Sequence, residues 1–212
     1  MLRVLLAMCL AACLRAEIVD RVAIYSGTQV ITELQLDEDM RVTAFLNRKS
    51  VARGVDARRA TARRLVDRML VEREMQLSRY PLPGAADIDR YFEQVKKLFG
   101  TEPAFEKALA KYDLTDAVLR AHLALQLTML RFIDYRFRPE AAISSAEISS
   151  YYRANLRAWT AARGDAPPPS LSASREAIRE TLIEQRAGKA LNAWLAENRK
   201  QMRLVYLDRT LE

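Results

Sequence analysis

The stretch "VAIYSGTQVITELQL", Val22–Leu36, contains the signals that decide the fold. Its first half has β-type residues on both sides of Ser26-Gly27, and glycine tolerates the positive φ that a tight hairpin turn needs. Its second half matches a capping box, in which the Thr32 side chain accepts from the Gln35 amide and Gln35 reaches back. The stretch therefore predicts a small β hairpin that leads directly into a helix beginning at Thr32.

Helical periodicity dominates the rest of the chain. Apolar residues recur three and four positions apart, and glycines, prolines or capping residues separate the periodic segments. The segment 115–137 is apolar around most of its circumference, so we expect it to lie at the centre of the fold. The predicted helices cover residues 32–47, 57–79, 87–99, 103–112, 115–137, 144 to the "PPP" run, and 174–202.

The last predicted element is a strand at "RLVYL", residues 203–207. A short strand is not stable unpaired, so we expect it to pair with the N-terminal hairpin. The predicted fold class is mostly α: a helical core with a small β ribbon formed by the N-terminal segment and the C-terminal strand.

Residues 1–16, "MLRVLLAMCLAACLRA", have the layout of a signal peptide. Arg3 forms a minimal positive region, an apolar run follows from Val4 to Ala12, and Ala16 is a small residue before the expected cleavage point. The apolar run is too short to span a bilayer. The segment predicts an exported, periplasmic protein.

Both cysteines, Cys9 and Cys13, lie within this segment. Cleavage after Ala16 would leave a mature chain without cysteine, which excludes a disulfide framework, a thiol nucleophile and a cysteine metal site. An alternative interpretation of Leu10–Cys13 is a lipobox, in which the thiol of Cys13 is lipidated and anchors the protein in the cell envelope. Contact with a membrane is expected only in that case.

The composition fits a helical protein with a charged surface. The chain has 34 Lys and Arg against 27 Asp and Glu, a formal net charge of +7, and half of its 212 residues are hydrophobic. Removing Arg3 and Arg15 with the signal lowers the net charge to 32 minus 27, or +5. Because basic residues are spread among acidic ones, we interpret clusters such as "ARRATARR" (57–64) as solvated helix faces and expect no nucleic-acid partner.

No catalytic motif stands out. The sequence has no nucleophile elbow, phosphate loop or paired metal-carboxylate spacing, so no catalytic residue, metal or cofactor is expected and the protein is not predicted to be an enzyme. The single histidine, His122, lies inside the apolar segment 115–137 and is interpreted as a core or boundary side chain. Asp37, Glu38 and Asp39 are interpreted as exposed charges in the first turns of a helix.

Four segments, in order, resemble the chaperone core of the SurA family, periplasmic proteins that hold unfolded outer-membrane proteins in transit. The first is similar to the family's opening strand, turn and helix, and the second carries Leu65-Val66-Asp67 at a family motif. The third is similar to a short helix followed by a long one, and the fourth to the closing helix, with Trp194-Leu195, and a terminal strand. The segments are "VDRVAIYSGTQVITELQLDEDM", "RRLVDRMLVEREM", "AFEKALAKYDLTDAVLRAHLALQLTMLRFID" and "SREAIRETLIEQRAGKALNAWLAENRKQMRLVYL".

The resemblance implies a domain organisation. Residues 17–163 would form a helical chaperone core of the SurA N-terminal type, and residues 174–212 would complete it with the closing helix and strand. In the family, parvulin-type prolyl isomerase domains lie between these two parts. Residues 164–173, rich in proline and serine, would be the linker that stands in place of the missing domain.

The resemblance also implies a function. We expect an ATP-independent holdase that binds unfolded polypeptides, outer-membrane protein clients among them, in an apolar groove. Met, Phe and Tyr suit such a groove because they combine adaptable or large apolar surfaces with, in tyrosine, a hydroxyl. The predicted client-binding residues are Met40, Phe45, Met69, Tyr91, Phe92, Phe99, Phe105 and Tyr151.

Two alternatives stay open from the sequence. One is an envelope lipoprotein or assembly subunit with a single dedicated protein partner. The other is a peptidyl-prolyl cis-trans isomerase.

Overall fold

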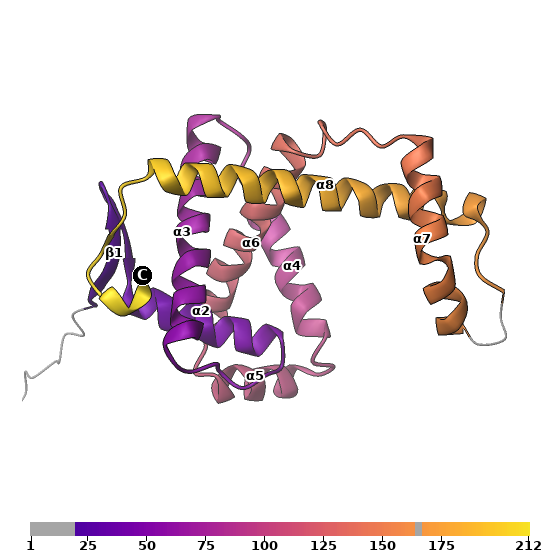
Figure 1. The fold of residues 1–212 in the computed structure, drawn as a ribbon. Helices are drawn as coiled ribbons and strands as arrows, with labels where there is room; N and C mark the ends of the chain where they lie inside the picture. The colour runs from indigo at the N-terminus through magenta and orange to yellow at the C-terminus, as the bar shows by residue number, and fades with distance from the viewer. Residues whose placement is uncertain (1–19, 164–166) are drawn as a thin grey trace, which may run out of the picture.

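The computed structural model describes residues 20–163 and 167–212, so the predicted signal peptide and Cys13 lie outside the described residues. Within these ranges the chain is mostly helical with one small antiparallel sheet, which confirms the predicted fold class (Figure 1). The strands are β1 (Val22–Ser26), β2 (Gln29–Thr32) and β3 (Val205–Tyr206). The helices are α2 (Glu33–Leu46), α3 (Val55–Leu77), α4 (Ala85–Lys97), α5 (Glu102–Lys111), α6 (Asp116–Arg136), α7 (Ser145–Arg163), α8 (Leu171–Gln201) and the short 3-10 helix η1 (Arg209–Leu211).

The hairpin forms where the sequence predicts it, with the turn one residue later. Ser26 pairs with Gln29, so the two loop residues are Gly27 and Thr28 rather than Ser26 and Gly27. Gly27 has φ +60. A two-residue hairpin loop with positive φ at its first position favours glycine there, which explains the shift.

The capping box that follows is confirmed. The Gln35 amide donates to Thr32 Oγ1 at 3.2 Å, and the Thr32 amide donates to Gln35 Oε1 at 3.0 Å. Helix α2 therefore begins at Glu33, directly after β2, and Leu36 is buried beneath the junction. The strand and the helix are rigidly joined as a result.

The two ends of the described chain meet in the sheet. Ile24 pairs with Tyr206 and Tyr25 with Val205, giving the strand order β2-β1-β3. The Leu207 amide also donates to the Ala23 carbonyl at 2.9 Å. The predicted pairing of the C-terminal strand with the hairpin is confirmed, and it leaves β2 at one edge of the sheet.

Helix α8 begins earlier than predicted. Its N-cap is Ser170, whose hydroxyl accepts from the Ala173 amide at 3.2 Å, so the helix starts at Leu171 and not at Ser174. Ser170 directly follows the prolines and is the first residue after them with a capping side chain. The linker expected at residues 164–173 thus overlaps the first turn of α8.

Two apolar cores lie on either side of α6. One fills the space between the sheet, α3, α6 and α8, with Ile24, Met75 and Phe132 fully buried. The other lies between α2, α4, α5 and α6, where Leu119 and Leu123 are fully buried. Helix α6 contributes to both cores, as its apolar circumference predicted.

Helix α8 runs from the sheet across α3 and α6 and continues outward to α7 (Figure 1). Helix α7 packs against this outer part of α8, away from the other helices. We call α7 together with residues 171–183 of α8 the arm, and the rest of the described chain the body. The arm is joined to the body through α8 and through the segment that connects α6 to α7.

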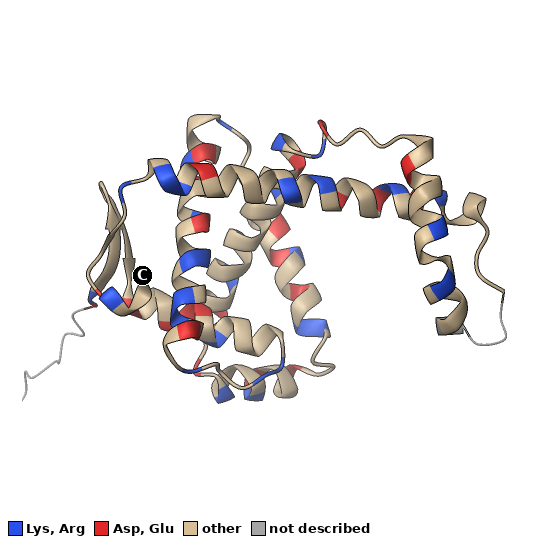
Figure 2. Ribbon diagram, in the orientation of Figure 1, with Lys and Arg blue, Asp and Glu red and all other residues tan. Residues whose placement is uncertain are grey.

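Charged residues of both signs alternate along the helices (Figure 2). Many of them form ion pairs between elements: Arg199 of α8 bonds to Asp67 of α3 at 2.7 Å, and Arg58 of α3 pairs with Glu33 of α2. None of the helices seen in residues 20–163 and 167–212 combines the length and apolar character that crossing a membrane requires.

Candidate functional site

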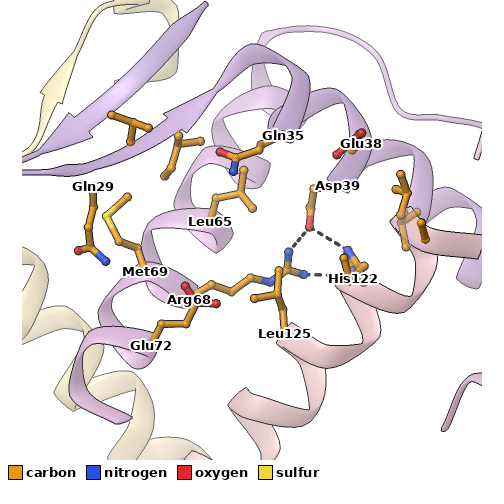
Figure 3. A pocket seen from close by; sticks show the side chains of 16 residues that line it. Gln29, Gln35, Glu38, Asp39, Leu65, Arg68, Met69, Glu72, His122 and Leu125 are labelled. Atoms are coloured by element: carbon orange, nitrogen blue, oxygen red, sulfur yellow. Dashed lines mark hydrogen bonds and ion pairs between the residues drawn. The ribbon is translucent and has the colours of Figure 1, made fainter. Parts of the chain in front are cut away.

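A hollow lies between β2, α2, α3 and α6 and opens to the surface (Figure 3). Its volume is about 580 Å³, and we call it the central groove. Apolar side chains form most of its walls. They are Val30, Ile31, Val42, Leu65, Met69, Ala117, Val118, Ala121 and Leu125.

Three helices build the groove with the same spacing. Each contributes four lining residues at positions i, i+3, i+4 and i+7, which lie on one face of an α-helix. These faces converge because α2 and α6 both pack against α3. The sets are Gln35, Glu38, Asp39 and Val42 on α2; Leu65, Arg68, Met69 and Glu72 on α3; and Val118, Ala121, His122 and Leu125 on α6, where Ala117 lines the groove in addition.

A buried cluster of charged groups forms the floor of the groove. Asp39 is only 3% exposed. Its Oδ2 accepts from Arg64 at 2.6 Å, and its Oδ1 accepts from Arg68. A buried carboxylate is costly unless it is paired and hydrogen-bonded, so the two arginines allow this charge to lie between α2 and α3.

His122 of α6 completes the cluster. Its Nδ1 lies 3.6 Å from Asp39 Oδ1, and its Nε2 lies 3.3 Å from Arg68 Nη2. Burial, together with the positive charge of Arg68, lowers the pKa of His122 from 6.5 to about 4. The imidazole is therefore neutral near pH 7, with its Nδ1 proton toward Asp39 and its Nε2 lone pair toward Arg68.

The polar network continues from His122 toward α4. The side-chain amide nitrogen of Gln126 lies 3.3 Å from His122 Nε2, and the Tyr91 hydroxyl donates to Gln126 Oε1 at 3.1 Å. These contacts link α2, α3, α4 and α6 through side chains alone. The network fixes the positions of the helices that form the groove.

Two further carboxylates line the groove without such partners. Glu38 and Glu72 form no ion pair with any described residue, although the chain has an excess of basic residues. Burial raises the pKa of Glu72, and the nearby charge of Arg68 offsets this only in part. Glu72 follows Met69 by three residues on α3, and both side chains line the groove (Figure 3).

The residues that line the groove define the chemical groups that it offers to a ligand. Among the described residues that line it there is no Ser, Thr, Cys or Lys, so it offers no hydroxyl, thiol or amine nucleophile. Across residues 20–163 and 167–212, no group of three or more His, Cys, Asp or Glu side chains is placed to hold a metal ion. The walls instead combine apolar surface, a strand and two unpaired carboxylates.

Four of the predicted client-binding residues form an aromatic cluster in the second core. Phe45, Phe92 and Phe105 are buried, and Phe99 stacks on Phe45 with ring centroids 4.8 Å apart. The Phe92 and Phe105 rings meet edge to face at 5.6 Å. These rings hold α2, α4 and α5 together. Phe45, Phe92 and Phe105 lie in the core, where they offer no surface to a client, and Phe99 is half-buried beside them.

The other four predicted residues lie in three different places. Met69 lines the central groove, and Tyr91 belongs to the network behind it. Met40 lines a smaller hollow of about 260 Å³ between α2 and α3. Tyr151 lies on the arm, beside a hollow of about 500 Å³ that Trp159 also lines. The predicted residues therefore do not form one continuous surface.

The groove residues that the sequence interpretation missed are the charged ones. Asp39 was interpreted as exposed, and it is buried. Its position contains a usable signal, since it lies three residues after Leu36 and three before Val42, on the apolar stripe of α2. A carboxylate in that phase requires a basic partner, and Arg64 and Arg68, four residues apart on α3, supply two.

No protein-family model matches the chain, and comparison with curated proteins also finds no match. The functional argument therefore depends on the residues and geometry described above.

Proposed function

We propose that the protein is a periplasmic, ATP-independent holdase chaperone that binds unfolded outer-membrane or secreted proteins in the central groove. It would have no prolyl isomerase activity. The observation that carries the proposal is the groove itself: an open hollow of about 580 Å³ with mostly apolar walls on three helices and one strand. Open apolar surface of this kind, rimmed by polar groups, is typical of protein-interaction sites.

A holdase needs a stable frame around an adaptable binding surface. The Asp39–Arg68–His122 cluster ties α2, α3 and α6 together beneath the groove. Met69 and Leu125, on facing walls, provide flexible apolar contacts, and the thioether of methionine adapts to side chains of different shape. Many weak contacts of this type allow release without nucleotide hydrolysis.

The arm offers a second surface for an extended client. Tyr151 and Trp159 lie along its hollow, with ring centroids 6.3 Å apart, and both side chains are half-buried. Large rings with a polar handle are well suited to binding sites that discriminate little between sequences. We propose that a long unfolded segment contacts both the central groove and the arm.

The test is suppression of aggregation. A denatured outer-membrane barrel protein is diluted with and without the mature chain, and light scattering is recorded. The variant Leu125→Gln places an amide on the groove wall, and Leu130→Gln, on the same helix but 51% exposed and outside the groove, is the matched control. We expect wild type and L130Q to suppress scattering and L125Q to do so less well, with far-UV circular dichroism confirming that both variants fold.

Unchanged scattering at a stoichiometric excess of wild-type chain would contradict the proposal. Tight binding of one native partner without any effect on unfolded clients would instead favour a dedicated assembly subunit. Acceleration of cis-trans exchange in a proline peptide would favour the isomerase.

A further inference from the structure

Among the strands in residues 20–163 and 167–212, β2 lies at one edge of the sheet. The sheet order is β2-β1-β3, so within these ranges β2 has a neighbouring strand on one side only. Gln29, Val30 and Ile31 all line the central groove, although consecutive side chains of a strand point to opposite faces. Three consecutive residues can border one hollow when that hollow lies along the strand's edge.

The hairpin register defines which backbone groups face that edge. Ser26 and Gln29 close the two-residue turn, and hydrogen-bonded and non-hydrogen-bonded pairs alternate along an antiparallel ladder. The backbone amide and carbonyl of Val30 therefore point outward, and the Val30 side chain is 48% exposed. An unpaired strand edge is a template for a further strand.

Charge adds a second, independent feature. Glu38 and Glu72 line the groove without ion-pair partners among the described residues, in a chain whose formal net charge is +7. Arg68, the basic residue that lines the groove, is already paired with Asp39, which also pairs with Arg64 behind it. Three carboxylates, those of Glu38, Asp39 and Glu72, line the groove against one basic residue, Arg68, so the charge that a ligand meets there is negative on balance.

We infer that the groove binds an extended polypeptide by strand addition to β2, with apolar side chains of the ligand entering between α3 and α6 and a Lys or Arg side chain reaching Glu72. The inference rests on the proposed function and specifies its binding mode. Strand addition takes its affinity from main-chain hydrogen bonds and its selectivity from pockets for alternate side chains. Strands of outer-membrane barrels alternate apolar and polar residues, so they match this arrangement.

Backbone methylation of a peptide tests the strand pairing. The probe is a short synthetic peptide of alternating apolar and polar residues with a central Arg, prepared unmodified, N-methylated at its odd positions, or N-methylated at its even positions. Only one of the two patterns places methyl groups on the edge that pairs with β2. We expect that pattern to weaken binding to the mature chain by about tenfold, and the other to bind like the unmodified peptide.

A charge exchange tests the role of Glu72. Replacing the central Arg of the probe by neutral citrulline should weaken binding to wild type by a few-fold. In Glu72→Gln, the Arg and citrulline probes should bind with equal affinity. The control is Glu74→Gln, in which citrulline should weaken binding as much as in wild type. Glu74 lies two residues further along α3, bonds to Ser78 and does not line the groove.

Equal binding of the two methylated peptides would overturn the inference. So would a difference in affinity between the Arg and citrulline probes that is as large in E72Q as in wild type. Failure of every probe to bind would also overturn it. The aggregation assay on the same preparation separates that outcome from failure of the proposed function, because scattering would then still be suppressed.

Discussion

The body and the arm are stabilised by different means. In the body, an aromatic cluster and the buried Asp39 ion cluster connect elements far apart in the sequence. In the arm, α7 packs on α8, with Ile148 and Ile178 buried, while Tyr151 and Trp159 are half-buried. Because more side chains are buried in the body, we expect it to be more stable than the arm, whose position depends on α8.

The aromatic cluster should show the largest effect. Phe105 of the short helix α5 is buried against Phe45, Phe92 and Phe99. Phe105→Ala leaves a cavity and should lower the free energy of unfolding by about 3–5 kcal/mol, measured by urea denaturation. Lys107→Ala, exposed on the same helix, is the control and should change it by less than about 0.5 kcal/mol. Equal effects of the two variants would show that the cluster does not hold the body together.

Asp39 comes next. Asp39→Ala removes the shared partner of Arg64 and Arg68 and leaves Arg68 as a largely buried cation, so we expect a loss of about 3 kcal/mol in the free energy of unfolding. The control is Asp37→Ala, which removes a mostly exposed carboxylate 3.3 Å from Arg58 and should cost about 0–1 kcal/mol. A loss for D39A no larger than that for D37A would mean that the ion cluster contributes little.

The pH dependence of stability follows from His122. In the unfolded chain its imidazole binds a proton below the ordinary pKa of 6.5, whereas in the folded protein the pKa is about 4. The unfolded state therefore binds more protons between these values, and the free energy of unfolding falls by about 1.4 kcal/mol per pH unit as the pH decreases through this window.

His122→Gln removes this contribution, so the difference in unfolding free energy between wild type and H122Q should vary across that pH range. The two proteins must be compared because burial raises the pKa of Asp67 and Glu72. These carboxyls make the unfolding free energy of both proteins rise as the pH decreases, and the difference between the proteins cancels this contribution. A difference that does not change with pH would contradict the neutral, buried state of His122.

The two tryptophans report separately on the arm and the body, and replacing the one on the arm should change stability least. Trp159 lies on the arm, and Trp194 packs against Phe132 in the body with ring centroids 4.9 Å apart. Trp159→Phe should change the stability of the body by less than about 0.5 kcal/mol, since it keeps an aromatic ring at a half-buried site. Trp194→Phe retains only Trp159 and reports on the arm, whereas W159F retains only Trp194 and reports on the body. The fluorescence of the first variant should change at a lower urea concentration than that of the second. Coincident transitions would show that arm and body unfold as one unit.

Much of the fold follows from local signals in the sequence. The capping boxes at Thr32 and Ser144 and the glycine turn each depend on residues a few positions apart. The structure contains both capping boxes, and the turn one residue later than predicted. The pairing of β3 with β1 could also be predicted, because a short apolar strand needs a partner and the hairpin was the one available.

The site was harder to predict because it depends on how helices face one another. Periodicity identifies Phe45, Phe92 and Phe105 as apolar, but it cannot distinguish a core position from a groove wall. The same limit explains Asp39: its acidic side chain suggested exposure, and only the position of α3 reveals its arginine partners. The free edge of β2 is likewise a property of the strand order.

Site-specific photo-crosslinking at the central groove tests most directly whether this hollow is where unfolded polypeptide binds. Residues 17–212 contain no cysteine, so a single introduced cysteine can carry the photoreactive group in a chain of these residues. It is placed at Leu125 in the groove or at Leu98, which is 66% exposed between α4 and α5 and outside the groove. With a denatured outer-membrane protein as client, we predict strong crosslinking from Leu125→Cys and little from Leu98→Cys. Equal crosslinking from both positions, or none from Leu125→Cys while aggregation is still suppressed, would contradict the groove as the binding site.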